Sequence, residues 1–314
     1  MGNKLIVTAA PHITGPDTTQ KIMQRVCIAL LPTLIASILI FGINSLILTV
    51  ITVAACMFFE WGYCKLTGRE VPVGDFSAAV TGVLLAFNLP ATLPWWMAIV
   101  GAFIAIVIVK QLFGGLGYNV ANPAIVARIA LAMGFASRMA NYPHPANGID
   151  ALASATPLAV SGDLGAANYV TLLLGNHGGV LGETCAITLL LGGIYLIATK
   201  VISPVIPVTY LATVAVLSAV SGHDPIVQLL SGGLMLGAFF MATDYVTSPT
   251  TNKGKLVFGI GLGIITCAIR FLGTMNEGVS FAILLMNLLV PYIEILTRQD
   301  RLGIAKAKKE GAAK

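Results

Sequence analysis

The sequence predicts an all-α integral membrane protein with about ten transmembrane helices, arranged as two inverted five-helix repeats. Its 314 residues are 57% hydrophobic and only 10% charged, and the mean hydropathy is +0.89. A soluble domain carries about 25% charged residues, so this composition excludes an ordinary soluble protein. A series of long apolar runs and a one-sided distribution of Lys and Arg lead to the same conclusion.

Ten apolar runs supply the predicted spans, because a spanning helix needs roughly 17–25 mostly apolar residues. The first repeat, at 22–138, contains the runs near 22–43, 46–66, 76–91, 93–113 and 121–138. The second repeat, at 182–297, contains the runs near 182–200, 205–221, 226–243, 255–273 and 278–297. The third and fifth runs are short or interrupted by polar residues and proline, so we expect their ends to be the least regular.

The basic residues predict how the chain crosses the membrane, since Lys and Arg are retained on the cytoplasmic side. With the N-terminus inside, fifteen of the eighteen Lys and Arg residues fall at cytoplasmic ends or loops, Lys110 among them. This orientation gives a cytoplasmic N-terminus at 1–21, an extracytoplasmic loop at 139–181 and a basic cytoplasmic tail at 298–314. The three exceptions, which this orientation does not place at cytoplasmic ends or loops, are Arg128, Arg138 and Arg270.

A weak internal repeat agrees with five spans per half. Thr81–Ala86 in the third run is similar to Gly232–Gly237 in the eighth, and Phe113–Asn119 before the fifth run is similar to Phe271–Asn276 before the tenth. An odd number of spans per half inverts the second half relative to the first, as in many transporters. Membrane composition alone can also produce similarity of this kind.

Several function classes are excluded by composition and spacing. The net charge of +5 is dispersed along an apolar chain, which is typical of a membrane protein and not of one that binds nucleic acid. No CxxC pair and no pair of histidines with metal spacing occur, so we expect no metal site. No GxxxxGK[ST] motif and no glycine fingerprint after a strand occur either, so we expect no complete active site for NAD or ferredoxin in this chain. We expect the cysteines to be small buried hydrophobic residues and the histidines to be structural. These residues are Cys27, Cys56, Cys64, Cys185 and Cys267, and His12, His144, His177 and His223.

The long extracytoplasmic loop contains the segment Asp150–Leu158, in which a hydroxyl lies between small residues. Pro157 disfavours helix at Thr156, which leaves that hydroxyl accessible to another enzyme. On composition alone the segment is an ordinary loop. In the context of the whole chain it resembles the flavinylation site of the family formed by the D subunits of Rnf complexes and the B subunits of sodium-translocating NADH:quinone reductases.

In that family a flavin transferase joins FMN through its phosphate to a threonine within a pattern close to Asp-x-x-Ser/Thr-Gly/Ser-Ala-Thr. Asp150, Ser154, Ala155 and Thr156 match this pattern, and Ala153 departs from it where a hydroxyl is common. The resemblance therefore implies covalent FMN on Thr156.

The resemblance covers nearly the whole chain. Gly114–Asn119 and the following Asn122-Pro123-Ala124 resemble the family's turn before its fifth span, and Phe240–Asp244 with Ser248-Pro249 resembles the counterpart after the eighth. It implies a membrane flavoprotein subunit of an ion-translocating ferredoxin:NAD⁺ oxidoreductase, which couples electron transfer to Na⁺ or H⁺ movement. The implied partners are the other subunits of the complex, a flavin transferase and the lipid of a bacterial or archaeal plasma membrane.

Two alternatives stay open. The length of the chain and its short N-terminal segment favour the Rnf branch, but the quinone reductase branch has the same motifs. A flavin-free solute channel or transporter with inverted repeats is the rival from another class, because a fold does not determine a function.

The resemblance also implies a second, noncovalent flavin such as riboflavin, for which we consider three polar residues. Asn122 offers donor and acceptor atoms to a ring edge, but a role in helix termination and close packing is an alternative. Arg128 lies in an apolar run and needs a partner, either a flavin or a carboxylate. Asp244 is able to bind a flavin or a cation, or to cap a helix.

Two further acids are expected to be interfacial. Glu60 lies near Lys65, and Glu294 precedes Arg298 by the four-residue helical spacing.

Overall fold

The structure, a computed structural model, describes residues 17–69, 72–142, 166–175, 177–183, 185–273 and 278–298, and every regular element in these ranges is a helix. Four helices are long and apolar enough to cross a membrane. They are α1 (Thr19–Phe41), α2 (Ile43–Thr67), α12 (Asn252–Leu272) and α13 (Val279–Thr297). The predicted fold class, an all-helical multi-pass membrane protein, is confirmed for the described residues.

Five further apolar runs form shorter helices. They are α3 (Ser77–Phe87), α4 (Trp95–Phe103) continued by the π-helix η2 (Ile104–Gln111), α5 (Pro123–Gly134), α8 (Ala186–Ala198) and α9 (Val205–Val220). Outside the eighth run, the remaining helical elements are short. They are η1 (Val73–Asp75), α6 (Ala136–Met139) and α7 (Ala166–Leu174).

The eighth run does not form one helix. It is divided into α10 (Pro225–Leu230), α11 (Leu234–Leu236) and the π-helix η4 (Gly237–Met241). The break contains Gly232 and Gly233, whose φ angles of 68° and 67° lie in the left-handed region that glycine adopts without strain. Each of the ten predicted runs therefore contains helix, but the lengths alone do not establish ten complete crossings.

Local sequence signals set the helix boundaries. The Thr18 hydroxyl accepts from the backbone N–H of Lys21 at the start of α1, and the Thr251 hydroxyl accepts from Gly254 at the start of α12. Gly42, with φ 79°, separates α1 from α2. These caps satisfy backbone groups that a helix terminus leaves without partners.

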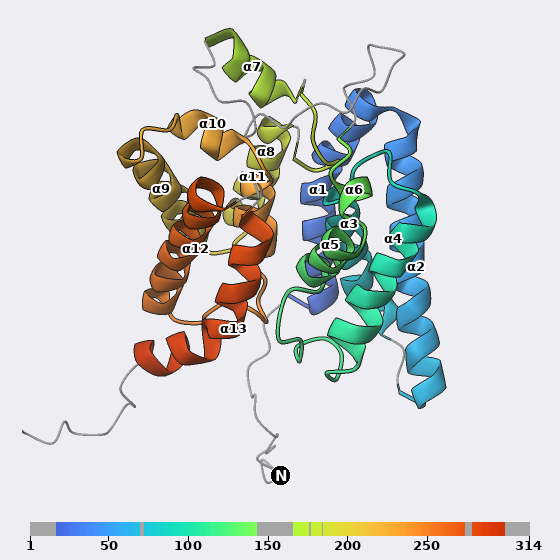
Figure 1. The fold of residues 1–314 in the computed structure, drawn as a ribbon. Helices are drawn as coiled ribbons and strands as arrows, with labels where there is room; N and C mark the ends of the chain where they lie inside the picture. Colours follow the sequence, from blue (N-terminus) through green and yellow to red (C-terminus); the bar gives the residue numbers. More distant parts are fainter. Residues whose placement is uncertain are drawn as a thin grey trace, which may run out of the picture.

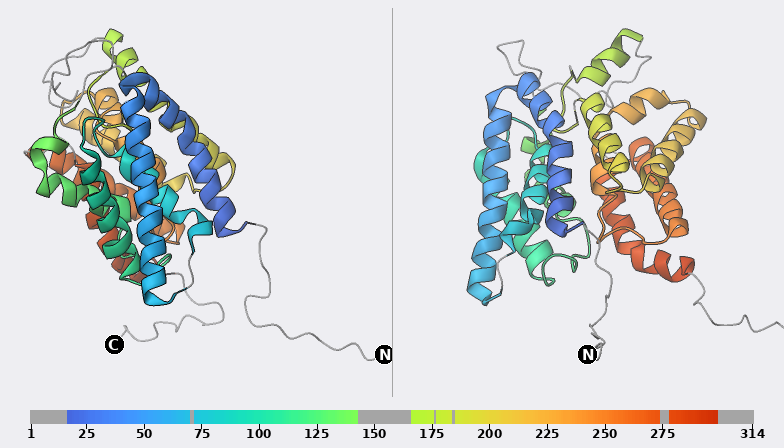
Figure 2. Two further views of the ribbon diagram at one scale, coloured as in Figure 1. Left: turned by 90° about the vertical axis from the view of Figure 1, so that its right-hand side faces the viewer. Right: turned by 180° about the vertical axis from the view of Figure 1, so that it is seen from behind.

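The two halves of the chain stand side by side (Figure 1). The helices α1 to α5 form one group and α8 to α13 the other, and the right-hand view of Figure 2 shows the same division from behind. Across the boundary α1 packs against α8, and α5 packs against α13. The start of α1 and the end of α13 lie toward one end of the molecule, and α7 lies at the opposite end.

Large apolar side chains cover the outer surface of several helices. On α1 these include Ile28, Leu31, Ile35 and Leu39, which are all exposed. A soluble monomer does not expose a continuous apolar surface of this kind, whereas a bilayer solvates it. The buried side chains instead form a core that contains residues of both halves.

Gly192 of α8 sets how closely the two halves approach. A Cβ atom at this position would lie 2.3 Å from the backbone oxygen of Ala29 on α1, and backbone cannot move as a side chain does. At Gly62 of α2, by contrast, a Cβ would meet no atom within 4 Å. The pair provides a matched test of packing at the boundary.

We expect Gly192→Ala to destabilise the folded protein by roughly 1–3 kcal/mol, the range for inserting a methyl group into a packed interior. Gly62→Ala is the control and should not lower the unfolding temperature in detergent, because alanine favours the helix over glycine. Equal unfolding temperatures for the two variants would contradict the close contact between α1 and α8.

Candidate functional site

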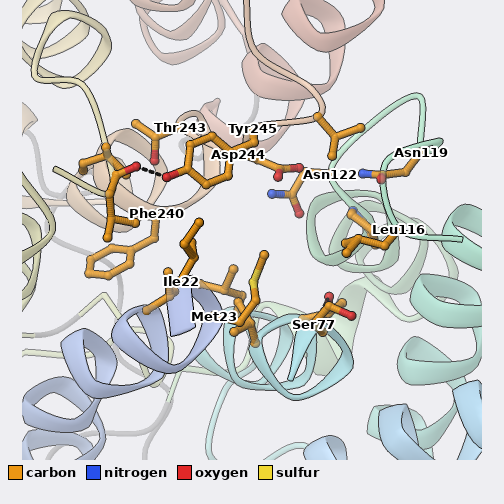
Figure 3. Close-up of a pocket in the computed structure, with 18 of the residues that line it drawn as sticks. Ile22, Met23, Ser77, Leu116, Asn119, Asn122, Phe240, Thr243, Asp244 and Tyr245 are labelled. Carbon is orange, nitrogen blue, oxygen red and sulfur yellow. Dashed lines mark hydrogen bonds between the residues drawn. The ribbon is translucent and has the colours of Figure 1, made fainter. Parts of the chain in front are cut away.

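A pocket lies between the two halves of the molecule (Figure 3). The first half contributes residues of α1, α3, η2, the start of α5 and the loop before it, and the second half contributes the end of α8, η4 and the turn after it. It encloses about 780 Å³ of space, counted with its open mouth.

The pocket has a mostly apolar lining with a few polar groups. Its apolar lining includes Ile22, Met23, Val26, Leu84 and Phe240, and its polar side chains are those of Ser77, Thr81, Lys110, Asn119, Asn122, Thr243, Asp244 and Tyr245. Apolar surface gives a planar ligand affinity, and a small number of polar groups fixes its orientation. Of the sequence-predicted residues, the structure brings Asn122 and Asp244 together here.

Asn122 has a structural role and also lines the pocket. It is the N-cap of α5, and its side-chain oxygen accepts from the backbone N–H groups of Ala124 and Ile125. Its side-chain nitrogen donates to the backbone oxygen of Met241 at 3.3 Å, at the end of η4. The predicted helix termination is therefore confirmed, and the same amide joins the two halves at the pocket.

Asp244 lies in the turn after η4, half-buried on the pocket wall. It does not cap α12, whose N-cap is Thr251. One carboxylate oxygen accepts from the Thr247 hydroxyl at 3.1 Å. Burial raises the pKa of Asp244, and hydrogen bonds from Thr247, Val246 and Asn119 and the charge of Lys110 oppose that rise.

The loop between η2 and α5 brings backbone close to the pocket. Gly114, Gly115 and Gly117 have φ angles of 124°, 97° and 92°, which residues with a side chain rarely adopt. Leu116 and Asn119 of the same loop line the pocket. The glycine-rich sequence is therefore required by the backbone conformation that places these two residues.

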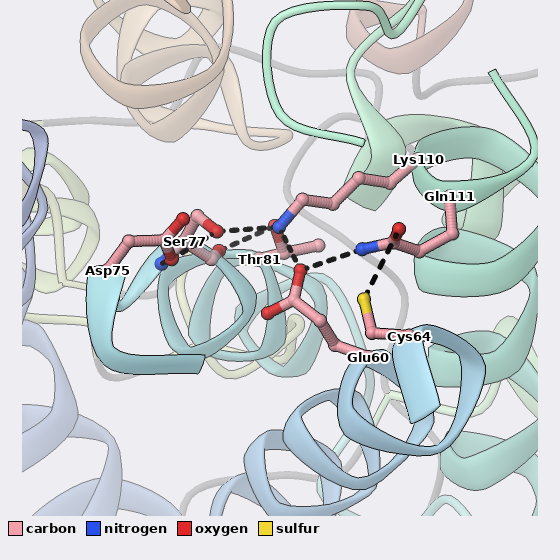
Figure 4. Close-up of polar contacts among 7 residues, drawn as sticks. All are labelled: Glu60, Cys64, Asp75, Ser77, Thr81, Lys110 and Gln111. Carbon is pink, nitrogen blue, oxygen red and sulfur yellow. Dashed lines mark hydrogen bonds and ion pairs between the residues drawn. The ribbon is translucent and has the colours of Figure 1, made fainter. Parts of the chain in front are cut away.

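A second polar cluster adjoins the pocket and contains a buried ion pair (Figure 4). The Lys110 ammonium lies 2.6 Å from Glu60 Oε1 and donates to Ser77 Oγ, also at 2.6 Å. Gln111 Nε2 donates to the same Glu60 oxygen at 3.0 Å. The side chains of Glu60 and Lys110 are 0% and 3% exposed.

This cluster corrects one expectation. Glu60 is buried and pairs with Lys110, not with Lys65, and Lys110 itself is the next-to-last residue of η2, at the end of its run. Hydrocarbon and protein interior both penalise an isolated charge, so the two residues, fifty positions apart, pair with each other. Lys65 instead lies over the Trp61 ring, 4.9 Å from its centroid. An ionisable residue inside an apolar run is the sequence signal by which Lys110 could have been found.

Arg128 forms a third cluster, which lies outside the pocket. Its guanidinium donates to Glu183 Oε1 at 3.2 Å, Asn88 Oδ1 at 3.1 Å and Ser280 Oγ at 2.8 Å. Arg128 and Glu183 are both buried. The partner of Arg128 is thus a carboxylate, the second of the two alternatives considered, and this geometry does not direct Arg128 toward a ligand in the pocket.

The remaining predicted residues have mainly structural contacts. Glu294 accepts from the backbone N–H and hydroxyl of Thr250, and the described residues include no ion pair between Glu294 and Arg298. His223 stacks on Phe271 with ring centroids 4.2 Å apart. Four of the five cysteines are buried and all are free, as predicted. In the described part of the chain no group of His, Cys, Asp and Glu is suited to hold a metal.

The predicted flavinylation segment lies outside the described residues, and so do Asp150 and Thr156. The structure describes only its flanks, with α6 before it and α7 after it.

Comparisons with known proteins agree with the sequence pattern. The profile of the NQR2, RnfD, RnfE family matches residues 6–303. The D subunit of the Na(+)-translocating ferredoxin:NAD(+) oxidoreductase complex of Acetobacterium woodii is 46% identical over 315 residues, which cover 98% of both chains. The D subunit of the proton-translocating ferredoxin:NAD(+) oxidoreductase complex of Clostridium ljungdahlii is 38% identical, over 96% of this chain and 97% of the relative. The D subunit of the ion-translocating oxidoreductase complex of Stutzerimonas stutzeri is also 38% identical, over 95% and 96% of the two chains.

The ion pair of Arg128 and Glu183 generates a stability prediction. Arg128→Met leaves the buried Glu183 carboxylate without its counter-charge, and such a loss costs about 3–5 kcal/mol. We expect a marked fall in unfolding temperature in detergent, part of which the double variant Arg128→Met with Glu183→Gln restores.

The control is Arg25→Met, which removes a pair with Asp17 of similar length, 3.0 Å, between partly exposed side chains. Exposed pairs contribute about 0–1 kcal/mol, so this variant should unfold close to the wild-type temperature. A fall for Arg128→Met no larger than that for Arg25→Met would show that the buried cluster does not stabilise the fold.

Proposed function

The chain belongs to the NQR2, RnfD, RnfE family, and we propose that it is the D subunit of an ion-translocating ferredoxin:NAD⁺ oxidoreductase complex. Two relatives named as D subunits of ferredoxin:NAD(+) oxidoreductase complexes, and one named as the D subunit of an ion-translocating oxidoreductase complex, match it over nearly their whole length. The observation that carries the proposal further is the pocket between the halves, which is lined by the two motifs that resemble the family's turns. The chain then carries electrons within the membrane, and the complex couples their transfer to Na⁺ or H⁺ translocation.

We propose that the chain crosses the membrane ten times as two inverted repeats, with both termini in the cytoplasm. Helix in every predicted run supports this, as do the positions of the α1 start and the α13 end toward one end of the molecule. A reporter fused after Asp163 should then lie outside the cell and one at the C-terminus inside it. Two reporters on the same side would contradict the proposed count.

We also propose that FMN is joined through its phosphate to the Thr156 hydroxyl by a flavin transferase. The match of Asp150, Ser154, Ala155 and Thr156 to the family pattern supports this assignment. The element that follows the segment, α7, lies at the end of the molecule away from the α1 start. The attachment site would thus be on the extracytoplasmic side.

A second, noncovalent flavin such as riboflavin is proposed for the pocket, because the residues there suit its ring. The Asp244 carboxylate is an acceptor for an imide N–H, and the amides of Asn119 and Asn122 offer both donors and acceptors to a ring edge. The aliphatic side chains of α1 and α3 offer apolar contact to the ring faces. A bound flavin supplies one- and two-electron chemistry, and the protein positions it and tunes its environment.

A relay of this kind is needed on physical grounds. The hydrocarbon core is about 30 Å thick, so a single flavin at the outer surface does not span it. The pocket lies on the side of the molecule where α1 begins, since Ile22 and Met23 of its first turns line it. A solute channel, the rival function, would need no flavin at either position.

Thr156→Ala should abolish covalent flavin. Co-expressed with a flavin transferase, the wild-type chain should fluoresce on a denaturing gel and the variant should not. Ser161→Ala is the control, because it removes a hydroxyl of the same predicted loop that lies outside the pattern and leaves the acceptor in place. Persistent fluorescence of the Thr156→Ala band would refute the attachment site.

Asp244→Asn should reduce the flavin that denaturation releases from the purified complex, because the variant loses the charged acceptor for the imide. Asp224→Asn is the matched control, since Asp224 is the N-cap of α10, does not line the pocket, and is replaced by an equally good cap. The measurement is flavin released per protein. A wild-type complex that releases none while keeping its covalent flavin would exclude the second site.

A further inference from the structure

Lys110 is part of the pocket wall and also of the buried ion pair with Glu60. It lines the pocket, and its ammonium is bonded to Glu60, which is not among the residues that line the pocket (Figure 4). Ser77 likewise lines the pocket and accepts from Lys110 at 2.6 Å. The pocket lining therefore includes a lysine whose counter-charge, Glu60, lies outside the lining.

The position of this ammonium is held by contacts on each side. Ser77, whose hydroxyl accepts from it, donates to Asp75 Oδ1 at 2.6 Å, and the Ser77 backbone N–H binds the same oxygen at 2.7 Å. Gln111, the next residue of η2, binds Glu60 from its own side. π-Helices occur frequently at functional sites, and η2 here delivers two consecutive polar side chains to one carboxylate.

The pair is not arranged for stability alone. Glu60 Oε1 accepts from both Lys110 and Gln111, whereas Glu60 Oε2 is buried without a hydrogen-bond partner among the described residues. An unsatisfied buried oxygen costs free energy, and apolar residues in place of a buried ion pair are often as stable. Buried ionisable residues at membrane depth are therefore expected to have a function.

The charges around the pocket indicate what that function is. With a neutral occupant, Lys110 is balanced by Glu60, and Asp244 is the remaining charged group on the pocket wall. An added negative charge in the pocket would be repelled by Asp244 and attracted by Lys110. In a site of low polarity both effects are stronger than in water. Lysine has three donors, and Glu60 and Ser77 take two of them in the described structure, which leaves one for the occupant.

We propose that Lys110 is the charge-compensating residue of this pocket, whose ammonium stabilises the occupant when it takes up an electron, while Glu60 sets how much of that charge the occupant experiences. The proposal rests on the proposed function, in which the occupant is a noncovalent flavin. One electron enters from the donor of the complex, reduced ferredoxin. Lys110 keeps its proton and forms no covalent bond. It is a positioning and electrostatic residue, not a catalytic one.

The test is a redox titration of the noncovalent flavin in the purified complex, followed by its absorbance. For Lys110→Met we expect the ratio of reduced to oxidised flavin at a fixed potential to fall about tenfold, which is about 59 mV for a one-electron couple. Glu60→Gln removes the counter-charge and keeps the ammonium, so its shift should have the opposite sign. Lys65→Met, at an exposed lysine over Trp61, is the control and should not shift the potential.

A merely structural role for the cluster would shift both variants in the same direction or not at all, and either result overturns the proposal. If Lys110→Met fails to assemble or loses its flavin, Glu60→Gln becomes the deciding variant. The proposal predicts a raised flavin potential for Glu60→Gln, so an unchanged or lowered potential would contradict it. A wild-type complex without noncovalent flavin defeats both this inference and the proposed second flavin. Unchanged potentials in flavin-loaded variants defeat only the role of Lys110.

Discussion

The fold depends on the requirement that every charge buried in an apolar chain must have a partner, and the guanidinium of Arg128 meets it by joining distant segments. Its bonds reach Asn88 after α3, Glu183 before α8 and Ser280 in α13. Because an unpaired charge at this depth would cost several kcal/mol, these segments are held together as a set. The cluster thereby links the first half to the second and the end of the long loop to both.

The same requirement shapes the boundary between the halves. Regular helices there are interrupted, and the ends of η4 and the loop before α5 are joined by the amide of Asn122. Irregular backbone at membrane depth is tolerated only where protein or a cavity satisfies it. The pocket occupies such a place, so the polar groups that terminate helices are also those that a ligand would meet. Structural capping and ligand binding are, for Asn122, compatible roles of one side chain.

Two kinds of ion pair in this molecule have different consequences. The partners of Arg128 lie in several segments, which suits a stabilising role. The Lys110 pair leaves one oxygen of Glu60 without a partner among the described residues and places its cation on a pocket wall. Burial, which weakens solvent screening, gives both pairs their strength. In the second pair it also makes the charge available to a bound molecule, which is why the pocket and the ion pair are best understood together.

Local features of the sequence determined the membrane class, the positions of the apolar helices, the Asn122 cap and the family, because hydrophobic length, capping chemistry and motif spacing are read along the chain. They also identified Asn122 and Asp244 as candidates for the site. The tertiary structure alone decided that Arg128 pairs with Glu183, that Glu60 pairs with Lys110 and not with Lys65, and that the eighth run is broken. These partners lie about fifty residues apart in the sequence. The energy of a charge depends on distance in space and on burial, neither of which a linear pattern specifies.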